Sequence, residues 1–124
     1  MLIVDDRASM RRIMRGLLTH LGFTAIAEAE DGVGAIDKMR ERKIGLVLAD
    51  LDMTPLSGVD FVKAVRAHTL LKDTPVIVTL AEADRGQIIA AREAGANAYI
   101  VKPFNAAALA QKIDAVLTAT AITP

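Results

Sequence analysis

The chain alternates short runs of aliphatic and β-branched residues with longer segments in which apolar positions recur at helical spacing. Continuous apolar runs are typical of buried parallel strands, whereas recurrence at i, i+3, i+4 and i+7 indicates an amphipathic helix. The pattern predicts strands at residues 2–4, 25–29, 44–49, 76–79 and 98–101. A helix is predicted after each strand, so the chain reads as five strand–helix units.

Several helix ends and inward faces are also predicted. Gly22 and Gly95 should end the first and fourth helices, as a glycine after the last turn commonly does. Asn105 is a favourable N-cap for the fifth helix, and residues 118–124 are expected to form a flexible tail. The residues expected to face the core include Met10, Ile13, Met14, Leu17, Leu18 and Leu21 of the first helix, Val33, Ile36 and Met39 of the second, and Leu109, Ile113, Val116 and Leu117 of the fifth.

Regular alternation of strands and helices predicts βαβ units and a parallel sheet. Each crossover should be right-handed. Five units fit a flavodoxin-like α/β fold, a three-layer sandwich whose sheet has the order 2-1-3-4-5, and are too few for an eight-stranded barrel. The length of 124 residues suits a single domain spanning residues 1–124.

Composition narrows the choice of partners. Fifteen basic and fifteen acidic side chains cancel, so no net field attracts nucleic acid or anionic lipid. The absence of cysteine excludes disulfides and thiolate metal sites. No apolar stretch approaches the roughly 20 residues of a membrane span, and acidic residues at positions 5 and 6 do not suit a signal peptide. We therefore expect a cytoplasmic protein with no nucleic-acid or membrane partner.

Polar signatures directly follow or end four of the predicted strands. They are Asp5-Asp6, Asp50, Thr79 and Lys102. If the strands are parallel neighbours, their carboxyl ends lie at one edge of the sheet, so these side chains should converge there. Ligands of open α/β sheets bind beyond this edge. Each signature alone is weak, because an Asp-Asp pair is usually a helix cap and Lys-Pro is common. Their shared position at one sheet edge favours a site.

The expected chemistry is that of a metal and a phosphoryl group. Three crowded carboxylates repel one another, and Mg²⁺, which prefers oxygen ligands, relieves that repulsion. A carboxylate such as Asp50 can accept a phosphoryl group. Thr79 and Lys102 would then meet this group on the side away from the cation.

The same residues belong to longer motifs that resemble a known family. The chain resembles the receiver domain of two-component response regulators, and within it the stand-alone, CheY-like chemotaxis type. The resemblance covers the whole chain. It rests on Val4-Asp5-Asp6, Ser9-Met10-Arg11-Arg12-Ile13, Glu28-Ala29-Glu30-Asp31-Gly32, Asp50-Leu51-Asp52-Met53 with Gly58, Val78-Thr79, and Tyr99-Ile100-Val101-Lys102-Pro103-Phe104.

The resemblance implies a role for each acidic residue. Asp50 would be the phosphoacceptor. Asp6 would bind Mg²⁺ directly, and Asp5 would act mainly through water. The backbone carbonyl of Asp52 would complete the protein ligands of the metal.

The resemblance also implies a switch. Thr79 and Lys102 would bind the phosphoryl oxygens, and Tyr99 would turn inward as Thr79 moves. The peptide bond between Lys102 and Pro103 would be cis, which is a minority state for X-Pro bonds. The protein would be a monomeric switch rather than a turnover enzyme.

The partners implied are a histidine kinase and a docking protein, with a flagellar motor switch protein or a phosphatase as candidates. The docking surface would be the fourth helix, fifth strand and fifth helix around Tyr99. It would include Ile88, Ala91, Ala98, Ala106, Ala107 and Lys112.

Three positions depart from the family pattern. Pro55 comes one place later than usual, Leu80 replaces a small residue, and Asp52 adds a carboxylate beside the acceptor. If Leu80 overhangs the site, it would slow entry of water or of a bulky phosphodonor.

Other functions remain open from the sequence. Asp50-Leu51-Asp52-Met53-Thr54 spells the motif of haloacid-dehalogenase-type phosphatases, but the remaining motifs of that family would stand in the wrong order. A pseudo-receiver would lack the acceptor or the lysine. The chain would otherwise be a phosphate sink or relay, or a receiver domain of a larger regulator.

Overall fold

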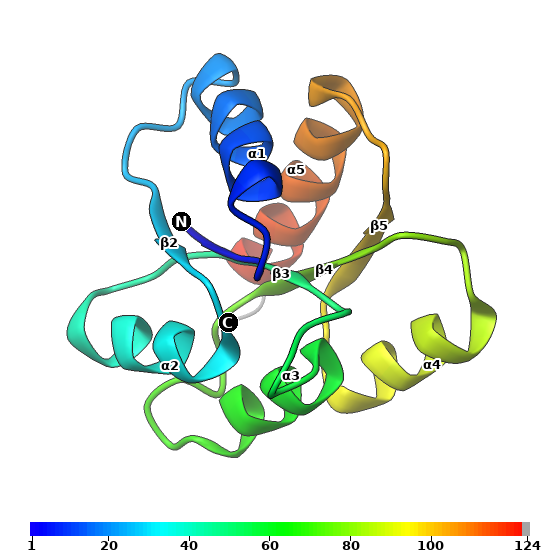
Figure 1. Ribbon diagram of the computed structural model, residues 1–124. Helices are drawn as coiled ribbons and strands as arrows, with labels where there is room; N and C mark the ends of the chain where they lie inside the picture. The colour runs from blue at the N-terminus through cyan, green and yellow to red at the C-terminus, as the bar shows by residue number, and fades with distance from the viewer. Residues whose placement is uncertain (123–124) are drawn as a thin grey trace.

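Five parallel strands form one sheet at the centre of the molecule (Figure 1). The structure is a computed structural model that describes residues 1–122. The sheet order is β2-β1-β3-β4-β5, which confirms the predicted flavodoxin-like topology. The strands are β1 (Leu2–Val4), β2 (Ala27–Ala29), β3 (Val47–Asp50), β4 (Val76–Leu80) and β5 (Ala98–Val101).

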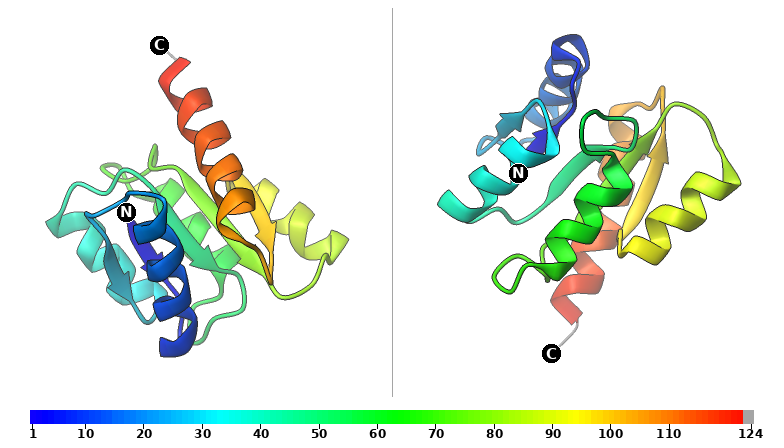
Figure 2. Two further views of the ribbon diagram at one scale, coloured as in Figure 1. Left: turned by 90° about the horizontal axis from the view of Figure 1, so that it is seen from above. Right: turned by 60° about the horizontal axis from the view of Figure 1, so that its bottom comes forward.

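Helices cover both faces of the sheet and complete the three layers (Figures 1 and 2). α1 and α5 lie on one face, whereas α2, α3 and α4 lie on the other. No helix within residues 1–122 is long and apolar enough to cross a membrane. The helices are α1 (Ala8–His20), α2 (Gly32–Glu41), α3 (Gly58–Ala67), α4 (Arg85–Ala94) and α5 (Ala106–Ile122).

Short polar residues begin α2, α3, α4 and α5, whereas α1 follows Arg7, whose side chain makes no capping hydrogen bond. Glycines follow the last turns of α1 and α4. Asn105 accepts a hydrogen bond from the backbone N–H of Ala108 at 2.8 Å, which confirms its predicted capping role. Asp31 caps α2 in the same way. Gly22 and Gly95 have φ values of +98° and +112°, a conformation that favours glycine.

Two apolar clusters lie on opposite faces of the sheet. Because side chains alternate along a strand, Leu2 and Val4 pack toward the α2–α3–α4 side, whereas Ile3 packs toward α1 and α5. The same alternation continues in β3 and β4. The core is mostly aliphatic, and Phe61 is its largest fully buried side chain.

The inward faces of three helices differ from the prediction. Ile13 and Val33 are 56% and 58% exposed. In α1 the buried stripe runs through Met14 and Leu18, so Ile13 lies to one side of it. In α2, Ala35 and Met39 are buried, and Val33 lies about 200° around the helix from Ala35. Likewise, Val116 of α5 faces the core and Leu117 is exposed.

The fifth helix is longer than predicted. α5 continues to Ile122 and includes residues 118–122, which were expected to belong to a tail. Alanines in this stretch favour helix. Residues 123 and 124, the rest of the predicted tail, lie outside the described residues.

Candidate functional site

The sheet brings the predicted polar residues together at its carboxyl edge. β1 and β4 are the two neighbours of β3, and Asp50 is the register partner of Thr79. The backbone N–H of Lys102 donates to the carbonyl of Leu80 at 2.7 Å, which fixes the residue that follows β5. Asp5 directly follows β1. The predicted convergence is therefore present in the fold.

The three acidic residues form a compact cluster. Asp5, Asp6 and Asp50 each offer a carboxylate oxygen, and these oxygens lie within 4.8 Å of one another. Asp5 and Asp50 are 0% and 2% exposed, whereas Asp6 is exposed to solvent. Buried carboxylates carry a large desolvation cost unless a cation pairs with them. The oxygen donors therefore suit a hard cation such as Mg²⁺.

Lys102 supplies an ammonium group that lies close to both Asp50 and Asp5. Its Nζ lies 3.1 Å from Oδ1 of Asp50 and 3.7 Å from Oδ2 of Asp5, and the lysine side chain is only 9% exposed. Asp5 has a second cationic neighbour, because Nε of Arg7 lies 3.8 Å from its Oδ1. The backbone N–H of Arg7 also donates to that oxygen at 2.9 Å.

Polar atoms without hydrogen-bond partners mark the position for a ligand. Among the described residues, Oδ2 of Asp5, Oδ2 of Asp50 and Oγ1 of Thr79 are buried and accept or donate no hydrogen bond. Buried polar atoms in native proteins nearly always have a partner. These atoms, which lie at the ends of three strands and make no hydrogen bond, are therefore suited to bind a metal and a phosphoryl group.

The surroundings of Asp50 change the pKa of its carboxyl group. Burial raises the pKa of Asp50 above its ordinary value, and the nearby Asp5 carboxylate adds to this rise. The hydrogen bond and charge of Lys102 oppose it without cancelling it. The ionised form of Asp50 is therefore costly in this site without a further cation.

Tyr99 lies outside this polar cluster. It pairs in register with Val78, whereas Thr79 pairs with Ile100. Tyr99 is half-buried and packs against the apolar core cluster that lies between the sheet and helices α2, α3 and α4. Nζ of Lys112 lies 5.1 Å from the centre of its ring. A cavity of about 230 Å³ adjoins the ring and is lined in part by Val78.

The residues of the predicted docking surface differ in exposure. Ala91 is buried, because α4 packs this alanine against the core, so it does not belong to the surface. Ala98, Ala106 and Lys112 are half-buried, and Ala107 is exposed.

The structure shows where the three residues that depart from the family pattern lie. Leu80 is 1% exposed and lies in the core, so it does not overhang the site. It extends β4 by one residue beyond the predicted strand. The Lys102–Pro103 bond is cis, as the resemblance implied, and the Thr54–Pro55 bond is cis as well. The Asp52 side chain is exposed.

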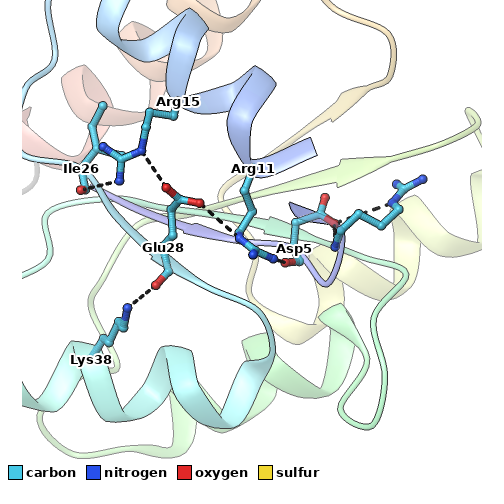
Figure 3. A network of polar contacts seen from close by, with 7 residues as sticks. Asp5, Arg11, Arg15, Ile26, Glu28 and Lys38 are labelled. Carbon is cyan, nitrogen blue, oxygen red and sulfur yellow. Dashed lines mark hydrogen bonds and ion pairs between the residues drawn. The ribbon is translucent and has the colours of Figure 1, made fainter. Parts of the chain in front are cut away.

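A polar network beside the acidic cluster was not predicted from the sequence (Figure 3). Nε of Arg11 and Nε of Arg15 donate to the two carboxylate oxygens of Glu28 in β2, at 3.2 and 2.7 Å. Lys38 of α2 donates to the backbone carbonyl of Glu28. Arginines four residues apart lie on one helix face, and this spacing was the available signal.

Comparison with known proteins agrees with this geometry. The sequence matches the response regulator receiver domain family over residues 1–114. It is 47% identical over 113 residues to the chemotaxis protein CheY of Pseudomonas aeruginosa, with 91% of each chain covered. The match to chemotaxis protein CheY-3 of Vibrio cholerae has the same identity and covers 91% of this chain and 87% of the relative.

A solved structure supports the assignment. The crystal structure of chemotaxis protein CheY4 from Vibrio cholerae gives a TM-score of 0.86 at 30% identity, covering 93% of this chain and 95% of that chain. The chain therefore belongs to the response regulator receiver domain family, whose members are signalling proteins rather than turnover enzymes.

Proposed function

We propose that Asp50 accepts a phosphoryl group from a histidine kinase and that the chain signals by docking to a partner while it is phosphorylated. One observation carries this proposal. The Oδ2 atom of Asp50 is buried without a hydrogen-bond partner. The Asp50 carboxylate lies beside those of Asp5 and Asp6, and its other oxygen, Oδ1, lies 3.1 Å from the Lys102 ammonium. An acceptor oxygen thus lies among groups that neutralise a phosphoryl group.

In the proposed transfer, an Asp50 oxygen forms a bond to phosphorus as the bond from phosphorus to the histidine nitrogen breaks. The electron pair of that bond returns to the imidazole. Asp6 and Asp50, with Asp5 through water and the Asp52 carbonyl, would hold Mg²⁺, which supplies charge neutralisation to the phosphoryl oxygens. Lys102 and Thr79 would donate to the remaining oxygens. Positioning and charge neutralisation dominate such reactions.

The proposed output is a change of population at the surface formed by α4, β5 and α5. Thr79 would move toward the phosphoryl group, and Tyr99 would turn inward. A partner that binds one state better shifts the equilibrium toward that state. The cavity beside the half-buried Tyr99 ring supports such a movement. Since relatives are named chemotaxis proteins, a flagellar motor switch protein is the proposed partner, with a phosphate sink or relay as the second function.

Mass spectrometry tests the phosphorylation. The protein is incubated with acetyl phosphate, with and without Mg²⁺, and a gain of one phosphoryl group is expected only with the metal. Asp50→Asn should abolish the gain, whereas Asp52→Asn, a matched change at an exposed neighbouring carboxylate, should retain it. Full labelling of Asp50→Asn would refute the acceptor assignment. Sustained phosphate release from many substrates would instead favour a haloacid-dehalogenase-type phosphatase.

A binding measurement tests the output. A flagellar motor switch peptide is titrated into the protein with and without beryllofluoride, which takes the place of the phosphoryl group. Motor docking predicts tighter binding with beryllofluoride and a loss of that gain in Tyr99→Ala. Equal binding in both conditions would favour the sink or relay.

A further inference from the structure

The guanidinium group of Arg11 joins the Glu28 carboxylate to the backbone of the acidic turn. Its Nε donates to Oε1 of Glu28 at 3.2 Å, and its Nη1 donates to the backbone carbonyl of Asp5 at 2.7 Å (Figure 3). That carbonyl belongs to the peptide group linking Asp5 to Asp6. Arg11 therefore connects α1, β2 and the turn after β1 through one planar group.

The Glu28 carboxylate is held in place by several contacts. Arg15 donates to Oε2 and to the carbonyl of Ile26 at 3.1 Å. The hydrogen bond and charge of Arg15, followed by the hydrogen bond and charge of Arg11, lower the pKa of Glu28, and burial opposes this effect without cancelling it. Glu28 thus remains ionised at neutral pH and is a fixed anchor for Arg11.

Asp6 depends on the backbone for its position. Its side chain is exposed, and among the described residues no hydrogen bond or ion pair is made to it. It must nevertheless remain close to Asp5 and Asp50, although like charges repel. The Arg11 contact to the adjoining peptide group opposes displacement of this turn.

We infer that Arg11 is a positioning residue that holds the Asp5–Asp6 turn in the geometry for Mg²⁺ binding. The inference rests on the proposed function, because it takes the acidic cluster to be a Mg²⁺ site. Arg11 would act through the Asp5 carbonyl and would not contact the metal. Outer residues that orient metal ligands commonly change metal affinity by 10- to 100-fold.

Charge and positioning predict opposite effects, which makes the inference testable. Arg11 is a cation close to an acidic metal site, so its charge alone weakens Mg²⁺ binding. Neutralising it would then tighten binding. If positioning dominates, Arg11→Gln weakens binding despite the removed repulsion. Arg15→Gln is the matched control. It removes a positive charge from the same helix and one hydrogen bond to the same Glu28 carboxylate. Within the part of the chain that the structure describes, Arg15 makes no hydrogen bond or ion pair with Asp5, so the Asp5–Asp6 turn keeps its contact with Arg11.

Isothermal titration calorimetry of the metal-free full chain with Mg²⁺ measures the binding affinity of each variant. We expect Arg11→Gln to bind about 10-fold more weakly than the wild type, at the lower end of the range for such residues, and Arg15→Gln to bind equally or slightly more tightly. Arg11→Lys, which retains the charge and the aliphatic stem but cannot make both bonds with one planar fork, should also weaken binding. It serves as the second variant if Arg11→Gln does not fold. Unchanged or tighter binding in the Arg11 variants would overturn the inference.

Amide hydrogen exchange without metal separates positioning from a general loss of stability. The backbone N–H of Arg7 donates to Oδ1 of Asp5 within the same turn. It should exchange faster in Arg11→Gln than in Arg15→Gln, while amides of β3 and β4 remain protected in both. Equal exchange in the two variants would contradict the inference. If the wild type binds Mg²⁺ but is never phosphorylated on Asp50, the proposed function fails while the Arg11 inference stands.

Discussion

The ammonium group of Lys102 lies 3.1 Å from Oδ1 of Asp50 and donates a hydrogen bond to it, although the two residues are 52 positions apart in the chain. The same ammonium lies 3.7 Å from Oδ2 of Asp5. One lysine, whose side chain is only 9% exposed, thus neutralises two buried carboxylates. This relationship makes the stability of the protein depend on the groups proposed to bind the phosphoryl group.

Replacing the shared cation should destabilise the fold. Lys102→Met leaves Asp5 and Asp50 buried without their common partner, and removing one member of a buried ion pair typically costs about 3–5 kcal/mol. Urea unfolding at pH 7 without Mg²⁺ measures the loss. In a double-mutant cycle, adding Asp50→Asn should recover part of it, since one carboxylate is then neutral. Additive effects of the two substitutions would contradict this coupling.

The stability gained by Asp50→Asn should depend on pH. The pKa of Asp50 is raised in the folded protein, chiefly by burial, so the folded state holds this proton more tightly than the unfolded state. The contribution of Asp50 to the stability of the wild type therefore falls as pH rises from the ordinary aspartate pKa of about 4 through the raised value. Without Mg²⁺, Asp50→Asn should be more stable than the wild type at pH 7, and this difference should shrink as pH falls toward 4. Thermal unfolding across this range gives the result, and a constant difference would count against the raised pKa.

Mg²⁺ should stabilise the wild type through binding. A ligand that binds only the folded state at 100 times its dissociation constant contributes about 2.7 kcal/mol. Asp6→Asn should lose most of this gain yet unfold normally without metal, because the Asp6 side chain is exposed. Melting temperatures measured against Mg²⁺ concentration provide the comparison. Equal Mg²⁺ gains in the two proteins would remove Asp6 from the metal site.

Two glycines should respond to alanine in opposite directions. A Cβ added to Gly58 would lie 2.4 Å from the Leu51 Cα and 2.6 Å from the Asp50 carbonyl oxygen. Gly58→Ala should therefore cost about 1–3 kcal/mol or more and slow labelling of Asp50. Gly16→Ala on the exposed side of α1 meets no atom within 4 Å and should stabilise the protein by up to about 1 kcal/mol. Urea midpoints compare the variants, and a stable, normally labelled Gly58→Ala would show that the close approach is not needed.

The fold and the acidic cluster were predictable because they follow from strand order and strand ends. Once strands 1, 3 and 4 are adjacent, residues that end or follow them must meet, and Asp5, Asp50 and Thr79 do. The family motifs also implied the cis bond before Pro103. These features follow from the order of the strands and from short motifs, and they do not depend on how individual side chains pack.

The remaining features depend on packing angles and on long side chains. Helical spacing could not locate the centre of the buried stripe, so Ile13 and Val33 were assigned to the core and are exposed. Leu80 was placed near the site, but alternation along β4 directs it into the core. Arg11 reaches both Glu28 and the Asp5 carbonyl, and spacing along the chain does not determine such contacts because the arginine side chain has many rotamers.

Locating the phosphoryl group within the chain tests the central claim most directly. The protein is phosphorylated with acetyl phosphate and Mg²⁺, and borohydride then reduces the acyl phosphate to an alcohol, so that the modified aspartate becomes homoserine. Peptide sequencing by mass spectrometry identifies its position. The structure predicts homoserine at position 50 alone, beside the Lys102 ammonium. Homoserine at position 5, 6 or 52, with Asp50 unchanged, would contradict the account.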